Sequence, residues 1–210
     1  MKKYKEILSK EFFISFLYSI GIFLLSLYFS GLANDYVKGL SGVYVPDVFL
    51  HYLPVVNVSY FIVQGAVLLA LLILILILLK PKYINFTLKS VAIFIMVRAF
   101  FISLTHLGSY PNQLVFDPNT FGYGIYDFLF SASNDFFFSG HTGMPFLMAL
   151  IFWKEKFWRD IFLVISLVFG ISVLLAHVHY SIDVFSAPFI TYSIFIVSKK
   201  LFSKDYKYMS

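Results

Sequence analysis

Long apolar segments separated by short polar stretches constrain the fold of this chain more than any other feature of its sequence. A membrane-spanning helix needs about 20 consecutive, mostly apolar residues. Six segments have this character, although the fourth is short: Phe12–Leu32, Tyr52–Leu79, Thr87–Leu107, Ser139–Trp153, Ile161–His177 and Ile182–Phe202. The sequence therefore predicts an all-α polytopic membrane protein with six transmembrane helices in one bundle.

The composition agrees with this interpretation. Of the 210 residues, 60% are hydrophobic and 13% are charged, which leaves too little polar surface to enclose a soluble core. Six spans use most of the chain, so a single membrane-embedded domain over residues 1–210 is predicted. The chain has no Cys, which excludes disulfides, thiolate catalysis and Cys-ligated metals. Covalent chemistry must then be carried by His, Ser or Asp.

Lys and Arg residues gather at alternate ends of the predicted spans. Fourteen of the 16 lie at the ends that share a side with the N-terminus: Lys2, Lys3, Lys5, Lys10, Lys80, Lys82, Lys89, Lys154, Lys156, Arg159, Lys199, Lys200, Lys204 and Lys207. Cytoplasmic loops carry an excess of basic residues, so both termini are predicted to be cytoplasmic. The first segment also has the position of a signal peptide, but its apolar run exceeds the usual ~7–15 residues and favours a retained helix.

The polar clusters of the sequence fall in the loops that this topology places outside the cytoplasm. They are "VPDVF" after the first span, residues 108–138 before the fourth, and "HVHYSID" before the sixth. The count of basic residues that gave the orientation did not use these clusters. Their convergence on one membrane face indicates a functional site on the extracytoplasmic side, and the plasma membrane is the expected location. The loop over residues 108–138 is expected to form an interfacial cover.

Two His residues and one Asp in these clusters suit phosphoryl transfer. His179 and Asp183 are four residues apart, so on a helix they share a face and can hydrogen-bond. A carboxylate bound to one imidazole nitrogen leaves the other nitrogen free to act as a nucleophile or base. His141 is the natural second partner, because displacement at phosphorus needs one group to attack and another to protonate the leaving oxygen.

Three further residues are candidates for binding a phosphate. Gly140 allows close approach of the backbone, Ser139 can donate a hydrogen bond from its hydroxyl, and amides at a helix start favour an anion. Arg98 lies about 17 Å into the third span. An unpaired guanidinium would be costly there, and a nearby phosphate site would explain its presence.

Each candidate also has a structural interpretation. A His at a helix end can be an interfacial hydrogen-bonding residue, Asp183 can cap the sixth helix, and Arg98 can pair with a structural Asp. Asp135 can bind substrate or support the start of the fourth helix. Pro46 and Asp47 are expected to form a turn rather than a ligand site. The occurrence of two His, one Asp and "SGH" on one face favours the functional interpretation.

These motifs together resemble the sphingomyelin synthase-related branch of the type 2 phosphatidic acid phosphatase superfamily. "DFFFSGHT", Asp135–Thr142, is similar to the fourth-span motif of that branch, and "HYSIDV", His179–Val184, is similar to its sixth-span motif. Weaker matches lie in "VPDVF" and around Arg98. The resemblance therefore extends over residues 45–184, which is most of the chain.

The resemblance implies a six-span enzyme whose site faces away from the cytoplasm. It implies His179 as a nucleophile that forms a phospho-histidine, Asp183 as its orienting partner and His141 as the acid–base group, with no metal or organic cofactor. Two departures concern the substrate: Ser133–Asn134 stands where the synthases have Cys-Gly, and Val173 stands where phosphatases of the wider superfamily have Arg. The substrate headgroup, the acceptor and the oligomeric state stay open.

The predicted activity is that of a lipid phosphatase or phosphotransferase without a nucleic-acid partner. The substrate would be a phospholipid or lipid phosphate, and the acceptor would be water or a lipid alcohol. The expected substrate contacts are Arg98, Asp135, Ser139 and Gly140. One alternative is a small transporter or ion-binding protein in which His141, His177 and His179 hold a metal or relay protons. A catalytically inactive relative of the same fold is the other alternative.

Overall fold

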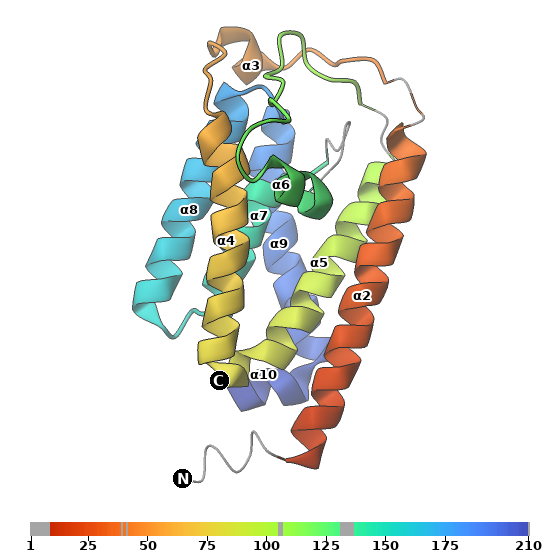
Figure 1. Ribbon diagram of the computed structural model, residues 1–210, viewed down its shortest axis with the longest axis vertical. Helices are drawn as coiled ribbons and strands as arrows, with labels where there is room; N and C mark the ends of the chain where they lie inside the picture. The colour runs from red at the N-terminus through yellow and green to blue at the C-terminus, as the bar shows by residue number, and fades with distance from the viewer. Residues whose placement is uncertain (1–8, 39, 41, 105–106, 131–136, 210) are drawn as a thin grey trace.

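The protein is a helical bundle in this computed structural model, which describes residues 9–38, 40, 42–104, 107–130 and 137–209 (Figure 1). Its elements in chain order are α2 (Lys10–Lys38), α3 (Val48–Tyr52), α4 (Ser59–Leu79), the 3-10 helix η1 (Pro81–Tyr83), α5 (Ile84–Leu104), α6 (Tyr123–Phe130), α7 (Gly140–Ile151), α8 (Lys156–Leu175), α9 (Ser181–Leu201) and α10 (Ser203–Met209). Within these ranges the only β-type pairing is an isolated bridge between Val43 and Leu107. The predicted all-α class is confirmed.

Among the described residues, five helices are long and apolar enough to cross a membrane: α2, α4, η1 with α5, α8 and α9. The fourth predicted segment is the helix α7, which has only 12 residues. At 1.5 Å per residue it is about 18 Å long, against about 30 Å for the hydrocarbon core. Five candidate spans are therefore established, and the sixth crossing stays a prediction.

The second predicted segment was wrong at its start. Tyr52 ends the short helix α3, and α4 begins only at Ser59. Pro54 lies between the two helices, and it disfavours helical backbone in the residue before it while removing an N–H donor. The apolar run of the sequence therefore contains two helices and a break rather than one continuous helix.

Helix α7 lies inside the bundle, in contact with α8, α9, α4 and α5 (Figure 1). Gly143 allows the close contact with α5 and α9. A Cβ at this position would come within 2.8 Å of the Thr191 hydroxyl oxygen and 2.9 Å of a Phe94 ring carbon. The small side chain therefore sets how deeply α7 can lie between its neighbours.

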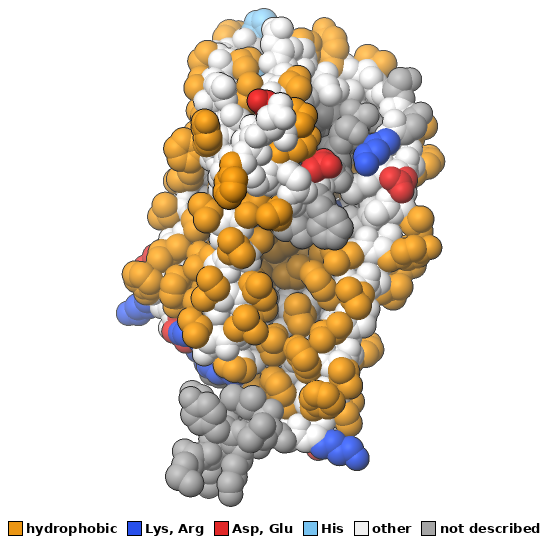
Figure 2. Space-filling view, viewed as in Figure 1, with side chains coloured by type: hydrophobic (Ala, Val, Ile, Leu, Met, Phe, Trp, Pro, Cys, Tyr) orange, Lys and Arg blue, Asp and Glu red, His pale blue; other side chains and the backbone are white. Residues whose placement is uncertain are grey.

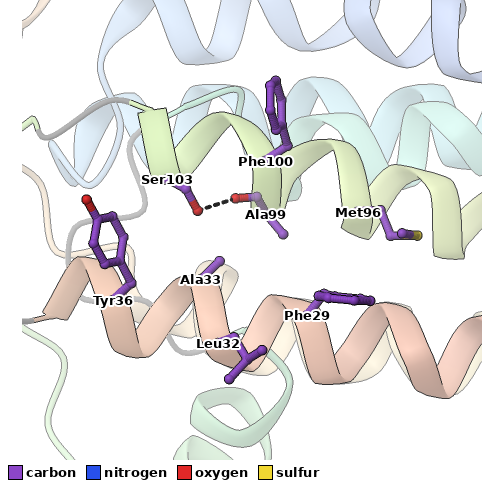
Figure 3. Close-up of a pocket in the computed structure, with 8 residues that line it drawn as sticks. All are labelled: Phe29, Leu32, Ala33, Tyr36, Met96, Ala99, Phe100 and Ser103. Carbon is purple, nitrogen blue, oxygen red and sulfur yellow. Dashed lines mark hydrogen bonds between the residues drawn. The ribbon is translucent and has the colours of Figure 1, made fainter.

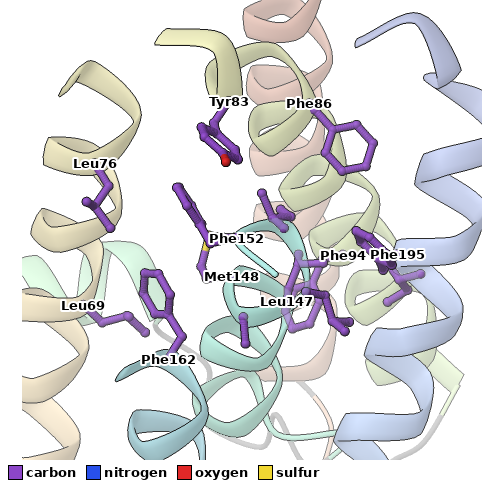
Figure 4. Close-up of a cluster of buried hydrophobic side chains, with 14 of the residues drawn as sticks. Leu69, Leu76, Tyr83, Phe86, Phe94, Leu147, Met148, Phe152, Phe162 and Phe195 are labelled. Atoms are coloured by element: carbon purple, nitrogen blue, oxygen red, sulfur yellow. The ribbon is translucent and has the colours of Figure 1, made fainter. Parts of the chain in front are cut away.

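Aromatic and aliphatic side chains from α4, α5, α7, α8 and α9 fill the centre of the bundle (Figure 4). Phe86, Phe94, Phe152 and Phe162 are almost fully buried. The rings of Tyr83 and Phe152 are stacked with centroids 4.4 Å apart, which joins the start of α5 to the end of α7. This core holds the helix ends that carry the polar motifs.

Helix α2 packs along α5, and a groove opens between them on their outer surface (Figure 3). The groove has a volume of about 400 Å³ and is mostly apolar. Ala33 and Ala99 are small residues from the two helices, and they keep the helices close at this point (Figure 3). The exposed side chains around them, such as Leu32 and Phe100, are of the type that faces lipid.

The visible surface of the bundle is apolar along its middle, and most charged side chains lie toward the ends (Figure 2). Lys89 is an exception to the predicted distribution. It lies inside α5 rather than in a loop, and its buried ammonium pairs with Asp205 at 2.6 Å. An apolar belt between charged ends fits a bundle that crosses a membrane.

Candidate active site

The two His-containing motifs meet where α7 and α9 begin. The backbone N–H of Ser139 donates to the carbonyl oxygen of Asp183 at 2.9 Å. The rings of His141 and His179 lie edge to face, with centroids 6.1 Å apart and an interplanar angle of 67°. The predicted convergence of the two motifs is therefore present.

His179 is paired with Asp183 as the sequence predicted. Its Nδ1 lies 3.4 Å from Oδ2 of Asp183, and both side chains are buried, with exposed fractions of 7% and 0%. His179 does not lie on a helix, because α9 begins at Ser181 after the capping residue Tyr180. The pairing thus forms across the helix start, and it leaves Nε2 of His179 as the nitrogen turned away from the carboxylate.

Asp183 also stabilises the start of α9. Its Oδ2 accepts the backbone N–H of Tyr180 at 3.0 Å. The structural interpretation as a capping residue is therefore confirmed, and the contact with His179 is present beside it, whereas the catalytic role of Asp183 stays a prediction. One carboxylate fixes the helix start and the imidazole at the same time.

Arg98 projects from α5 toward the start of α7. Its Nε donates to the carbonyl oxygen of Phe138 at 3.2 Å. A Cβ at Gly140 would lie 3.1 Å from Nη1 and 3.2 Å from Cζ of Arg98. The missing side chain of Gly140 therefore makes room for the guanidinium, and His141 lies close enough to interact electrostatically with both Arg98 and His179.

Ser139 is the N-terminal cap of α7. Its side-chain oxygen accepts the backbone N–H of Thr142 at 3.4 Å, and the residue is fully buried. This contact gives Ser139 a structural role beside the predicted substrate contact, which stays a prediction. Asp135 lies outside the described residues.

The segment between α5 and α7 places an aromatic side chain beside the site. The ring of Tyr126, on α6, lies 5.9 Å from the ring of His141. Leu114 in the same loop donates its backbone N–H to Ala176 at 2.9 Å, which fixes the loop to the end of α8. The sequence predicted an interfacial cover over residues 108–138 but not that Tyr126 contacts His141. The one local signal is its three-residue spacing from Tyr123, which puts both on one face of α6.

Asp47 is a second residue that the sequence analysis missed. It caps α3 by accepting the N–H groups of Phe49 at 2.9 Å and Leu50 at 3.1 Å. Its other oxygen accepts the N–H of Ser181 at 2.7 Å. The predicted turn is therefore present, but the same carboxylate also holds the first residue of α9, two positions after His179.

Hydrogen bonds also set the protonation of Asp47. Burial alone would raise its pKa, but the N–H groups of Leu50, Ser181 and Phe49 outweigh burial and lower the pKa below its ordinary value. The carboxylate is therefore charged at neutral pH.

His177 points away from the two catalytic candidates. Its Nε2 lies 3.2 Å from the carbonyl oxygen of Leu53, and its ring packs against Tyr110 with centroids 5.4 Å apart. Within the described ranges, no group of three or more His, Cys, Asp or Glu side chains is arranged to hold a metal ion. This geometry counts against the alternative in which His141, His177 and His179 share a metal.

Part of the chain is similar to a known sequence family. Residues 133–200 match the family model described as PAP2 superfamily C-terminal. The matched segment contains His141, His179 and Asp183, whereas Asp47 and Arg98 lie outside it. A search of curated proteins returned no match, and neither did a search of solved structures. The family match supports membership of the PAP2 superfamily and, with the apolar helices, a membrane protein of the phosphatase type.

Proposed function

We propose that this protein is an integral membrane enzyme that cleaves a phosphate ester of a phospholipid or lipid phosphate through a phospho-histidine. The observation that carries the proposal is the pairing of His179 with Asp183, opposite His141 and beside Arg98. A nucleophile with an oriented tautomer, a second imidazole and a cation are the groups that phosphoryl transfer requires.

In the first half of the proposed reaction, Nε2 of His179 attacks phosphorus. The bond between phosphorus and the leaving oxygen breaks, and His141, as an imidazolium, gives its proton to that oxygen. The products are phospho-His179, the free alcohol and neutral His141. Asp183 keeps the proton of His179 on Nδ1, so that Nε2 presents its lone pair.

Arg98 would neutralise the equatorial phosphate oxygens during this step. A guanidinium offers several N–H donors in a planar fork that matches phosphate geometry. The N-terminal amides of α7 beside Gly140 can add donors from the opposite side. Gly140 supports this arrangement because it leaves the guanidinium room against the helix start.

The second half of the proposed reaction decides between a transferase and a hydrolase. The acceptor hydroxyl gives its proton to His141 while its oxygen attacks phosphorus, and the P–N bond to His179 breaks. Water gives hydrolysis, and a lipid alcohol gives a new phospholipid. The cover formed by Tyr126 would disfavour water, because its ring lies over His141.

The proposal that the substrate is a lipid depends on the position of the site along the helix bundle. Arg98 is about 21 Å along α5 from Ile84, within one of the candidate spans. A phosphate at this depth would reach the site most readily on a molecule that is itself in the bilayer. We further propose that both termini are cytoplasmic and that the site faces outward in the plasma membrane, as the basic residues predict.

The test uses purified protein in liposomes with a panel of phosphate-bearing lipids, with and without a diacylglycerol or ceramide acceptor. Mass spectrometry then follows the products. A new phospholipid that requires the acceptor identifies a transferase, whereas free phosphate or a free phosphorylated headgroup identifies a hydrolase. His179→Ala should remove either product, and His51→Ala, which changes an exposed His elsewhere on the chain, should retain it.

Two results would contradict the proposal. Turnover that survives in His179→Ala would exclude the phospho-histidine route. A wild-type protein that turns over no lipid in the panel would instead favour an inactive relative or a transport function.

A further inference from the structure

A large cavity lies at the end of the bundle opposite the two His residues. It has a volume of about 870 Å³ and is bounded by residues of α2, α5 and the junction between α9 and α10. The helix α9 has 21 residues and therefore separates this cavity from His179 by about 30 Å. The cavity has no part in the proposed reaction.

A buried ion pair forms the polar wall of the cavity. The ammonium of Lys89 donates to Oδ2 of Asp205 at 2.6 Å and to the hydroxyl of Ser15 at 2.8 Å. Ser15 in turn donates to Oδ1 of Asp205 at 2.7 Å. Because an ammonium has three N–H donors, Lys89 retains capacity for one more acceptor in the cavity that it lines.

The rest of the lining combines basic, apolar and neutral polar side chains with one further carboxylate, that of Glu11. Lys204 and Lys207 stand at the exposed side, and Phe12, Leu201 and Phe202 supply apolar surface. A soluble anion would use only the basic part of this lining. An amphiphile with a phosphate and an apolar portion would use both.

The surrounding charge favours an anion strongly. The described residues at this end of the bundle include 11 basic and four acidic side chains: Lys10, Lys80, Lys82, Lys89, Lys154, Lys156, Arg159, Lys199, Lys200, Lys204 and Lys207, against Glu11, Glu155, Asp160 and Asp205. Basic pockets between membrane-spanning helices on the cytoplasmic side are suited to the headgroups of anionic lipids. The apolar belt of the bundle begins directly beside this end (Figure 2).

We propose that this cavity binds an anionic phospholipid of the membrane leaflet at that end of the bundle. The headgroup phosphate would lie near Lys89, Lys204 and Lys207, and the acyl portion would leave past Leu201 and Phe202. The bound lipid would join α2, α5 and α10, which already share the ion pair of Lys89. The proposal is independent of the catalytic activity, since the cavity lies at the other end of the molecule.

The experiment measures the midpoint of thermal unfolding of the purified protein in a neutral detergent. Phosphatidylglycerol, phosphatidylcholine or soluble glycerol phosphate is added at equal concentration. Phosphatidylglycerol should raise the midpoint by about 3 °C or more, because a ligand that binds only the folded state stabilises it. Phosphatidylcholine and glycerol phosphate should each give a much smaller rise.

A pair of matched variants locates the effect. In the double variant Lys204→Ala and Lys207→Ala, both changed residues line the cavity, and the rise should be lost. The double variant Lys154→Ala and Lys156→Ala removes the same charge at the start of α8 and the turn before it, outside the cavity lining, and it should retain the rise. An equal rise with glycerol phosphate would mean a soluble anion site instead of a lipid site. A rise that both double variants retain, or that both lose, would overturn the cavity as the binding site.

Discussion

Asp183 fixes two neighbours with one carboxylate, since its Oδ2 contacts both Nδ1 of His179 and the N–H of Tyr180. Asp183→Asn keeps an oxygen for the helix cap but no longer carries the charge that holds the tautomer and stabilises an imidazolium. We expect the variant to fold normally and to turn over lipid about 10²–10⁴-fold more slowly. Steady-state kinetics give the rate, and circular dichroism gives the helix content.

The matched control for Asp183→Asn is Asp117→Asn. Asp117 is an exposed loop residue whose side-chain oxygen accepts hydrogen bonds from the backbone N–H and the side-chain amide of Asn119. The Asp117→Asn variant should turn over lipid at the wild-type rate. A wild-type rate in Asp183→Asn would mean that the carboxylate acts on the helix start alone.

Gly140 is predicted to control the position of Arg98. In Gly140→Ala the new Cβ would lie 3.1 Å from Nη1 of Arg98, so the guanidinium must shift by a few tenths of an ångström. Because phosphate recognition depends on this geometry, we expect turnover to fall about tenfold or more while the unfolding midpoint changes little. Gly21→Ala, where nothing lies within 4 Å of the new Cβ, should leave turnover unchanged. Equal effects of the two variants on turnover would mean that Gly140 does not position Arg98 for the reaction.

The sequence predicted that His141, His179 and Asp183 lie together better than it predicted the contacts around them. The spacing of His179 and Asp183 and the polar character of both motifs were the signals, and the roles of the three residues in a reaction stay predictions. The hydrogen bond between Asp47 and Ser181 joins residues 134 positions apart. A loop sequence has no periodic pattern from which such a contact could be predicted. Tyr126 was missed for the same reason, because its contact with His141 depends on how the loop folds back.

Among the helices, Asp47 joins the start of α3 to the start of α9. Asp47→Ala removes the cap of α3 and leaves the N–H of Ser181 without this acceptor. We expect the free energy of unfolding to fall by about 1–3 kcal/mol and turnover to fall with it, because His179 lies just before α9. Thermal unfolding in detergent measures the first change. Asp117→Ala should change neither quantity, and an unaltered midpoint in Asp47→Ala would show that the bond to Ser181 contributes nothing to stability.

The lowered pKa of Asp47 gives this link a pH dependence with a definite sign. Unfolded Asp titrates near ~3.9, and a group with a lower pKa in the folded state adds stability above that pH. The contribution is lost as the pH falls below about 4 through the folded pKa. We expect the stability difference between wild type and Asp47→Asn to be constant from pH 5 to 8 and to shrink below about pH 4. Thermal unfolding across this range measures it, and a difference that instead grows on acidification would contradict the assignment.

The apolar pattern predicted which elements exist and was less reliable for where they end. The predicted Ile182–Phe202 agrees closely with α9, because a polar cap and a basic end delimit it. Tyr52–Leu79 failed at Pro54, which breaks the helix within an apolar run. Ser139–Trp153 exceeded α7 because Phe152 and Trp153 are apolar but lie in a turn. Hydropathy reports where a side chain can be buried, not where backbone hydrogen bonds stop.

At the scale of the molecule, the helices alternate in direction and separate two kinds of polar site. The helix α9 runs along the bundle from one end toward the other (Figure 1). His179 lies just before its start, and the cavity with Lys89 lies where it ends. The sequence predicted this polarity from basic residues alone. It could not predict the cavity, since the cavity depends on how α2, α5 and the junction between α9 and α10 pack around Lys89.

The orientation of the bundle is testable because the chain has no Cys. Ser109 is exposed near the site end, and Ser203 is exposed at the start of α10. In intact cells, Ser109→Cys should react with a membrane-impermeant maleimide, and Ser203→Cys should react only after permeabilisation. The reversed pattern would place the proposed active site in the cytoplasm.

The short helix α7 decides whether the bundle crosses the membrane six times. The turn after α7 is fixed to the turn after α4, since Glu155 pairs with Lys80 at 2.5 Å and accepts from the Tyr83 hydroxyl at 3.3 Å. The turn after α4 lies at the end with the basic residues, so the chain must reach that end between α7 and α8. We therefore expect Lys156→Cys, like Ser203→Cys, to be protected from the impermeant maleimide in intact cells. Labelling of Lys156→Cys without permeabilisation would mean that α7 does not complete a crossing.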